Sequence, residues 1–327
     1  MGILDGRSIL ITGGTGSFGK EFVKHVLANH DVKRLVVFSR DELKQFEMQN
    51  EIDSDVLRYF IGDVRDQSRL ERAFAGIDTV IHAAAMKQVV AAEYNPMECI
   101  KTNVLGAENI INAAINMGVE RVVALSTDKA VNPINLYGAS KLCSDKLFVA
   151  ANYLSAGTGP KFCVVRYGNV VGSRGSVVPF FKGLRHTGKL PITDERMTRF
   201  WITLEEGIKF VENCWNMTQG GEVFVPKIPS MKITDMATAL APECEQEVVG
   251  IRPGEKLHEI MIPADESRQT YEYDNFFIIQ PSMSNIEVGE RAPYHGETGK
   301  PVAEGFSYAS DANDQWVTAE QLLEMVD

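Results

Sequence analysis

The first half of the chain alternates short apolar runs with stretches in which apolar residues recur at helical spacing. The apolar runs predict strands at residues 8–12, 34–39, 57–61, 79–81, 122–125 and 162–167. The stretches between them predict helices, the longest over 96–117 and 137–153. Strands that alternate with helices form a parallel sheet with helices on both faces. The pattern therefore predicts an α/β fold with a doubly wound parallel sheet.

Beyond about residue 170 the pattern changes to short, mixed elements. It predicts helices over 179–184 and 204–216 and a short strand at Val248-Val249. Residues 285–327 are polar, without periodicity until the last turn near Leu322, and predict a loosely packed appendage. We therefore expect a dinucleotide-binding domain over 1–170, to which later segments return, a smaller mixed α/β substrate lobe over 171–284, and an appendage over 285–327.

Composition narrows the class of protein. A net charge of −11 argues against a surface for nucleic acid or anionic membranes. The five cysteines are scattered without a Cys-x-x-Cys spacing, which is typical of reduced thiols in a cytoplasm. No stretch resembles a signal peptide or a membrane span. We expect a cytoplasmic protein, and the sequence assigns it no metal.

A glycine-rich turn follows the first predicted strand and opens a helix. Glycines let the backbone turn tightly and approach a pyrophosphate, and the helix N-terminus attracts its charge. Dinucleotide binding is therefore favoured over a plain glycine loop, through Gly13, Thr15, Gly16, Ser17, Phe18 and Gly19.

The end of the second strand bears on the cofactor. A fold that binds NAD usually places an acidic residue here for the ribose hydroxyl. In this chain Ser39 can donate to a 2′-phosphate, while Arg40 and Lys44 add positive charge. We infer NADP rather than NAD. The alternative is that both cations are surface charges and Asp41 binds the ribose.

Further candidates for the cofactor follow the other strands. Asp63 could meet the adenine amino group, or it could be an ordinary turn aspartate. Lys87 could reach the nicotinamide ribose or the substrate, and a surface lysine is an equal alternative. The remaining predicted cofactor contacts are Val64, Ala83, Thr102, Tyr137, Lys141 and Val170.

The stretch from Ser126 to Lys141 carries the predicted chemistry. Tyr137 and Lys141 are four residues apart in a helical pattern and so share one face. An ammonium beside a tyrosine lowers the pKa of the phenol, which then serves as a general base toward an alcohol. The alternative is a Tyr/Lys pair on a solvated helix. Just upstream, Thr127, Asp128 and Lys129 place an acid beside an amine.

These motifs resemble those of the extended short-chain dehydrogenase/reductase superfamily, through residues 12–19, Asp63-Val64 and the Tyr137/Lys141 pair. Within it, residues 39–44, 126–130, 166–177 and 252–259 resemble the inverting UDP-N-acetylglucosamine 4,6-dehydratases. The resemblance covers roughly residues 1–281. Retaining dehydratases carry Thr-Asp-Glu where this chain has Thr127-Asp128-Lys129.

The resemblance implies a UDP-sugar substrate, an NADP cofactor and a homo-oligomer, from a dimer to a hexamer. It also implies the first step of pseudaminic acid synthesis for flagellin glycosylation. Arg199 and Arg252 could hold a diphosphate bidentately, although an isolated arginine is more often a surface residue. The implied substrate-binding residues are Lys87, Asn169, Val177, Arg199, Arg252 and Glu255.

The resemblance further implies a role for each residue of the catalytic stretch. Tyr137 takes the proton of the sugar 4-hydroxyl as hydride leaves C4, and Thr127 hydrogen-bonds the 4-oxygen. Lys129 then removes the C5 proton, which requires a lowered pKa. Asp128 protonates the departing 6-hydroxyl, which requires a raised pKa. Hydride returns to C6, and the sequence does not identify the group that reprotonates C5.

Three other activities are compatible with the sequence. A retaining dehydratase or a C4-epimerase would use the same fold. A non-catalytic NADP-binding regulator would not need the Tyr137/Lys141 pair or the Asp128-Lys129 pair. A simple alcohol dehydrogenase would accumulate NADPH in proportion to product.

Overall fold

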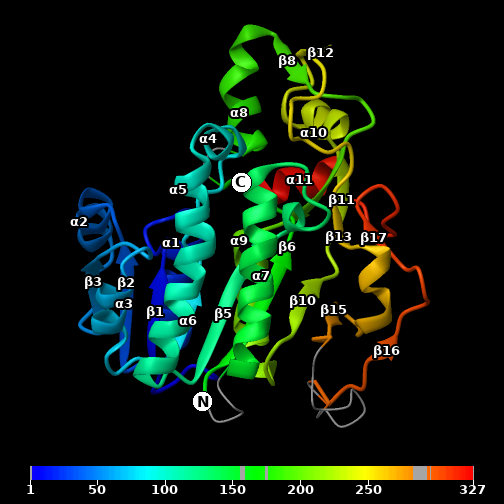
Figure 1. The fold of residues 1–327 in the computed structure, drawn as a ribbon. Helices are drawn as coiled ribbons and strands as arrows, with labels where there is room; N and C mark the ends of the chain where they lie inside the picture. The colour runs from blue at the N-terminus through cyan, green and yellow to red at the C-terminus, as the bar shows by residue number, and fades with distance from the viewer. Residues whose placement is uncertain (1, 155–158, 174–175, 283–292, 295, 327) are drawn as a thin grey trace.

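The structure is a computed structural model that describes residues 2–154, 159–173, 176–282, 293–294 and 296–326. Its main sheet has ten strands in the order β16-β14-β15-β10-β6-β5-β4-β1-β2-β3 (Figure 1). The parallel part consists of β1 (Ser8–Thr12), β2 (Arg34–Ser39), β3 (Leu57–Ile61), β4 (Thr79–His82), β5 (Arg121–Thr127), β6 (Lys161–Tyr167) and β10 (Val223–Pro226). The strands β15 (Phe276–Ile279), β14 (Thr270–Glu272) and β16 (Lys300–Pro301) add an antiparallel edge. The predicted doubly wound sheet is confirmed.

The core strands are apolar because helices cover both of their faces. Every residue of β1 is buried, and Ile9, Leu10 and Ile11 are fully so. Right-handed crossovers in opposite directions from β1 place the two sets of helices on opposite faces. On one face α3 (Gln67–Phe74), α6 (Gly106–Met117) and α7 (Leu136–Leu154) lie side by side. The helices α1 (Ser17–Asn29) and α9 (Leu204–Met217) contact each other on the other face.

The predicted helix over 96–117 is present, with one π-helical turn inside it that the sequence did not predict. It consists of α5 (Pro96–Ile100), a π turn η1 (Lys101–Leu105) and α6. The wide turn lets the buried Asn103 bond the backbone of Met86 twice, at 2.8 and 3.0 Å, and Ser140 Oγ at 2.9 Å. A π turn of this kind often marks a functional site. Here it ties the loop after β4 to α7.

The smaller lobe lies above the carboxyl ends of the parallel strands in Figure 1. It has its own apolar core, centred on side chains such as Phe181, Trp201 and Met236. The helix predicted over 179–184 lies within α8 (Val177–Leu184), and the predicted strand ends at Val248, so Val249 lies just beyond it. The helix predicted over 204–216 is present as α9, which packs on the main sheet. The elements of the lobe besides α8 are β8 (Lys189–Ile192), β9 (Thr198–Ile202), β11 (Ser230–Lys232), α10 (Ile233–Leu240) and β12 (Glu245–Val248), with β7 (Asn169–Val170) leading in.

The end of the chain is not loosely packed, contrary to the sequence-based expectation. Tyr308, in β17 (Tyr308–Ala309) beside β13 (Ile260–Ile262), donates to Ile228 O at 2.8 Å and accepts from Ile228 N at 2.9 Å. Leu322, in α11 (Ala319–Val326), is fully buried. The hydroxyl of Tyr308 and the buried side chain of Leu322 thus hold this segment against the body of the protein. Residues 285–292, 295 and 327 of the predicted appendage, and Arg174 and Gly175 of the family motif, lie outside the described residues.

Two further observations concern the whole described chain. Its five cysteines are all free. Among the described residues no helix combines the length and apolarity needed to cross a membrane.

Candidate active site

The glycine turn between β1 and α1 forms the predicted cradle for a dinucleotide. Gly13 has φ +67°, a left-handed conformation, and a Cβ there would lie 2.9 Å from Ala84 N. A Cβ on Gly19 would lie 2.5 Å from the Cα of Gly14. The helix begins at Ser17, and its N-cap residue is Gly16, which has no side chain to bond the N–H groups of the first turn. The turn, the open helix end and the flanking strand therefore fit a pyrophosphate.

Thr15 and Phe18 lie in the same segment, and the other predicted cofactor residues follow neighbouring strands at this edge of the sheet. Ser39 ends β2, and its Oγ accepts from Gln45 Nε2 at 3.0 Å, which leaves its own proton free to donate. Asp41 caps α2 (Glu42–Glu51) and pairs with Lys44 at 2.9 Å. Arg40 is 60% exposed and lies 3.7 Å from Asp63. Arg40 is thus better placed than Lys44 to meet a 2′-phosphate.

The remaining predicted cofactor residues occupy varied surroundings. Both oxygens of Asp63 accept hydrogen bonds from Arg65. Ala83 follows β4, and its N–H donates to Thr12 O at 3.3 Å. Lys87 is exposed on the loop after β4. Val64 and Thr102 are buried, and Val170 lies in β7.

Tyr137 and Lys141 lie in the first turns of α7, both buried. Lys141 Nζ donates to Leu125 O at 2.7 Å. Burial raises the pKa of Tyr137 to about 12, and the cation that opposes this rise is Lys129. The expected lowering of the Tyr137 pKa by Lys141 is therefore wrong for the polypeptide itself. The physical reason is that desolvation of the phenolate outweighs the nearby positive charge.

Thr127, Asp128 and Lys129 lie where β5 ends and the short helix η2 (Asp128–Ala130) begins. Asp128 is fully buried, and its Oδ1 accepts from Thr127 Oγ1 at 2.9 Å and from Lys129 Nζ at 3.0 Å. Its Oδ2 is buried and makes no hydrogen bond with any described residue. The proton of Thr127 points to Asp128, whereas the sequence predicted a bond to the sugar oxygen.

Lys129 also lies 3.3 Å from Asn169 Oδ1 and 3.5 Å from Glu259 Oε1. Burial lowers the pKa of Lys129, but the attraction of Asp128 and Glu259 outweighs it, so the net shift of that pKa is upward. The expected low pKa is wrong for the polypeptide itself, which holds Lys129 as an ammonium.

Glu259 is the residue that sequence reasoning missed. It is buried, and its carboxylate lies 3.5 Å from Lys129, 3.7 Å from Lys256 and 3.9 Å from Arg199. Its Oε2 makes no hydrogen bond with any described residue. The signal was its place at the end of the 252–259 motif. Nothing in that motif shows that it reaches the amine.

A cavity of about 610 Å³ opens beside Lys129 and brings most of the predicted substrate residues together. Lys87 is not among its lining residues. Arg199 donates to the carbonyls of Thr198, Leu257 and Lys256, so much of its guanidinium is already bonded. Arg252 is exposed on a loop that Asn135 ties to the Tyr137 region through a 2.8 Å bond to Gly254 O. The predicted substrate residues on the wall are Asn169, Val177, Arg199, Arg252 and Glu255.

The main sheet is of the Rossmann type, and its glycine cradle fits a dinucleotide. The helix with Tyr137 and Lys141 adds the arrangement of a short-chain dehydrogenase/reductase. The chain belongs to the family described as "Polysaccharide biosynthesis protein", whose model matches residues 9–281.

The chain is similar over almost its whole length to two enzymes of known name and to one solved structure. The chain is 57% identical over 328 residues to a UDP-N-acetylglucosamine 4,6-dehydratase (inverting) from Campylobacter jejuni subsp. jejuni serotype O:23/36, covering 99% of this chain and 98% of that protein. It is 38% identical over 328 residues to a UDP-glucose 4-epimerase of Rickettsia conorii, covering 98% and 95%. The solved structure of Pen from Bacillus thuringiensis is 36% identical, with a TM-score of 0.89 over 99% of this chain and 98% of that one.

Proposed function

We propose that the protein removes water across C5 and C6 of UDP-N-acetylglucosamine, leaves a ketone at C4 and inverts C5. The product is UDP-2-acetamido-2,6-dideoxy-β-L-arabino-hex-4-ulose. The observation that carries the proposal is the 3.0 Å contact between Asp128 and Lys129, whose lysine lines the cavity. The charges of both residues act on Tyr137. The 57% identity to an inverting dehydratase supports it over the epimerase, to which the identity is 38%. By the same likeness, the reaction is the first step of pseudaminic acid synthesis.

The cofactor we propose is NADP. The glycine cradle fits either dinucleotide, and the choice depends on the end of β2. There Asp41 is committed to capping α2 and to Lys44, while Ser39 and the exposed Arg40 present a donor and a positive charge. When bound, NADP⁺ supplies a reversible hydride acceptor and a positive ring that favours a nearby phenolate. The cofactor is regenerated, so NADPH does not accumulate.

The first task of the protein is to remove the proton of the sugar 4-hydroxyl. Tyr137 is the base, although its pKa of about 12 shows that the phenolate is not formed by the polypeptide alone. Lys129 is the cation that stabilises the phenolate. Lys141, bonded to Leu125 O, orients α7 against β5. The resulting 4-ketone makes the C5 proton acidic.

Elimination of water then needs an amine and a carboxylic acid. Because Lys129 Nζ and Asp128 Oδ1 are 3.0 Å apart, one proton can pass between them. Transfer from the ammonium to the carboxylate gives a neutral amine and a neutral acid together. The amine takes the C5 proton, and the acid gives its proton to the departing 6-hydroxyl, so protons and charges balance. Lys129 ends as an ammonium and Asp128 as a carboxylate, as they began.

The diphosphate we assign to Arg252. It lies on the cavity wall, is exposed and is held near the Tyr137 region by the Asn135–Gly254 bond. Arg199 is bonded to three carbonyls and lies 3.9 Å from Glu259, so it positions that carboxylate.

We also propose a homo-oligomer. The helix α4 (Val89–Tyr94), α5 and η1 expose apolar side chains, including Val90, Tyr94 and Met97. Light scattering of the purified protein over a range of concentrations tests this, and a monomer at all of them would refute it.

The experiment that tests the function is incubation with UDP-N-acetylglucosamine, followed by proton NMR of the product. The expected spectrum shows a 6-deoxy-4-keto sugar with the C5 configuration inverted. A product with retained C5 would indicate a retaining dehydratase, and an isomer of unchanged mass would indicate a C4-epimerase. Bound NADP without turnover would indicate a regulator, and stoichiometric NADPH would indicate a simple dehydrogenase.

A further inference from the structure

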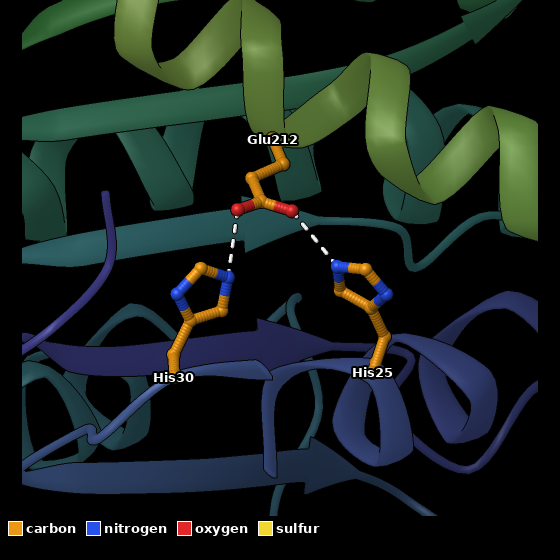
Figure 2. Close-up of side chains that lie close together, drawn as sticks. All are labelled: His25, His30 and Glu212. Carbon is orange, nitrogen blue, oxygen red and sulfur yellow. Dashed lines mark hydrogen bonds and ion pairs between the residues drawn. The ribbon is translucent and has the colours of Figure 1, made fainter. Parts of the chain in front are cut away.

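Two histidines and a glutamate meet between α1 and α9, on segments that contribute nothing to the cavity (Figure 2). His25 lies in the last turns of α1, His30 just follows that helix, and Glu212 lies in α9. His25 Nε2 is 2.8 Å from Glu212 Oε2, and His30 Nε2 is 2.7 Å from Glu212 Oε1. One carboxylate thus faces two imidazoles, one on each oxygen.

The two ring nitrogens of His30 lack hydrogen-bond partners of normal geometry among the described residues. The side chain of His30 is only 6% exposed. Buried polar atoms in proteins nearly always have a partner, and an unpaired one needs an explanation. The Nε2 atom lies 2.7 Å from Glu212 Oε1 outside hydrogen-bond geometry, and a cation bound to both atoms would replace this contact.

The donor set has the chemistry of a transition-metal site. Imidazole nitrogens with one carboxylate are ligands that Zn²⁺ accepts, at about 2.0–2.2 Å from the ion. Ligands on either side of such an ion are at most about 4.2 Å apart, and the three donor atoms here all lie within 4.8 Å of one another. The contacts of Glu212 with His25 and His30, at 2.8 and 2.7 Å, would widen on binding, because two ligands of a tetrahedral ion lie about 3.3 Å apart. The donors are near enough to one another for a small rearrangement to surround an ion.

The surroundings favour a divalent ion as well. Asp5 Oδ1 lies 3.7 Å from the other ring nitrogen of His30, where a carboxylate commonly orients a metal-binding histidine. Glu212 and Asp5 together carry two negative charges, which balance one divalent cation beside two neutral imidazoles. The side chains of His25 and Glu212 are 15% and 13% exposed, so an ion has access from solvent.

We propose that His25, His30 and Glu212 form a binding site for a divalent metal of the zinc class. The metal clamps α9 to the end of α1, the helix that begins at the glycine cradle. Its role is structural, and water or a solvent-facing group completes the coordination.

The test uses the full chain, freed of metal by chelation and then titrated with Zn²⁺. Calorimetry is expected to show one site per chain, and the melting temperature is expected to rise by several degrees. Glu212→Gln keeps the shape of the side chain and removes its charge, so we expect at least tenfold weaker binding and no thermal shift. His186→Gln, which changes an exposed histidine elsewhere, serves as the matched control and should behave as the unmodified chain does.

Cobalt provides a second readout that does not depend on how well a variant folds. Co²⁺ added to the unmodified chain should give the visible absorption of a low-coordinate site, and equimolar Zn²⁺ should abolish it. The proposal is overturned if Zn²⁺ does not bind, if cobalt stays spectroscopically aqueous, or if His25→Asn and Glu212→Gln bind Zn²⁺ as tightly as the unmodified chain. These readouts are independent of turnover, so they do not depend on the proposed activity.

Discussion

The Nζ atom of Lys129 lies 3.5 Å from Oε1 of Glu259, a residue from a distant part of the chain. With Asp128 at 3.0 Å, the amine stands between two carboxylates and is held as an ammonium. A base must lose that proton before it can act. Asp128, which stabilises the ammonium, is also the group that can accept its proton. Glu259 determines how readily Lys129 releases that proton.

Glu259→Gln is expected to ease the transfer of the Lys129 proton to Asp128. Glu259 raises the pKa of Lys129, so its removal lowers that pKa, and the ammonium gives up its proton more readily. We expect kcat to rise by up to about tenfold, the equivalent of one pKa unit. Steady-state rates measure the change. Glu272→Gln, at an exposed pair with Lys227, is the control, and an unchanged kcat in Glu259→Gln would remove Glu259 from this role.

Tyr137→Phe is expected to reduce turnover by about 10²- to 10⁴-fold, the usual contribution of a positioned general base. Cofactor affinity should change little, because the ring and its burial are preserved. Kinetics together with a fluorescence titration of NADPH separate the two effects. Tyr94→Phe removes a hydroxyl from a side chain that is 83% exposed and should leave the rate unchanged. Retention of half the activity by Tyr137→Phe would rule out its role as the base.

Arg40→Ala is expected to weaken NADP binding by about threefold to tenfold and NAD binding hardly at all. The guanidinium is exposed, so its contact with a 2′-phosphate is partly screened by water. Dissociation constants for both cofactors give the comparison. Arg72→Ala, an arginine in the last turn of α3, provides the control. An equal loss for both cofactors would indicate that the residue does not discriminate between them.

His82 is expected to make the protein sensitive to acid. It is 2% exposed, and burial, with some repulsion from Lys141, lowers its pKa from 6.5 to about 3. The unfolded chain therefore binds a proton below pH 6.5 that the folded chain refuses until about pH 3, so stability falls as the pH falls through that window. Between pH 7 and pH 5 the loss is about 2 kcal/mol. Urea unfolding of His82→Gln should show a pH dependence smaller by that amount. If His82→Gln and the unmodified chain lose equal stability, the histidine is not the cause.

The sequence predicted the sheet because strands buried on both faces consist of unbroken apolar runs, as Val122 to Leu125 show. It could not predict the π turn at Lys101–Leu105, since a wide turn keeps the apolar pattern of the helices on either side. Nor could it predict the pKa directions at Tyr137 and Lys129. These depend on burial and on a carboxylate, Glu259, that reaches the amine only in the folded chain. The segment around Tyr308 looked loose because the hydrogen bonds of the Tyr308 hydroxyl to the Ile228 backbone leave no signature in the apolar pattern.

The account depends most on Lys129 as the base that removes the C5 proton of the ketone. Reaction in D₂O with NMR detection at C5 tests this directly, with unmodified protein and with Lys129→Ala. The unmodified protein should give an inverted product that carries deuterium at C5, and Lys129→Ala should show no C5 exchange above the rate without enzyme. C5 exchange at the full rate in Lys129→Ala would contradict the account.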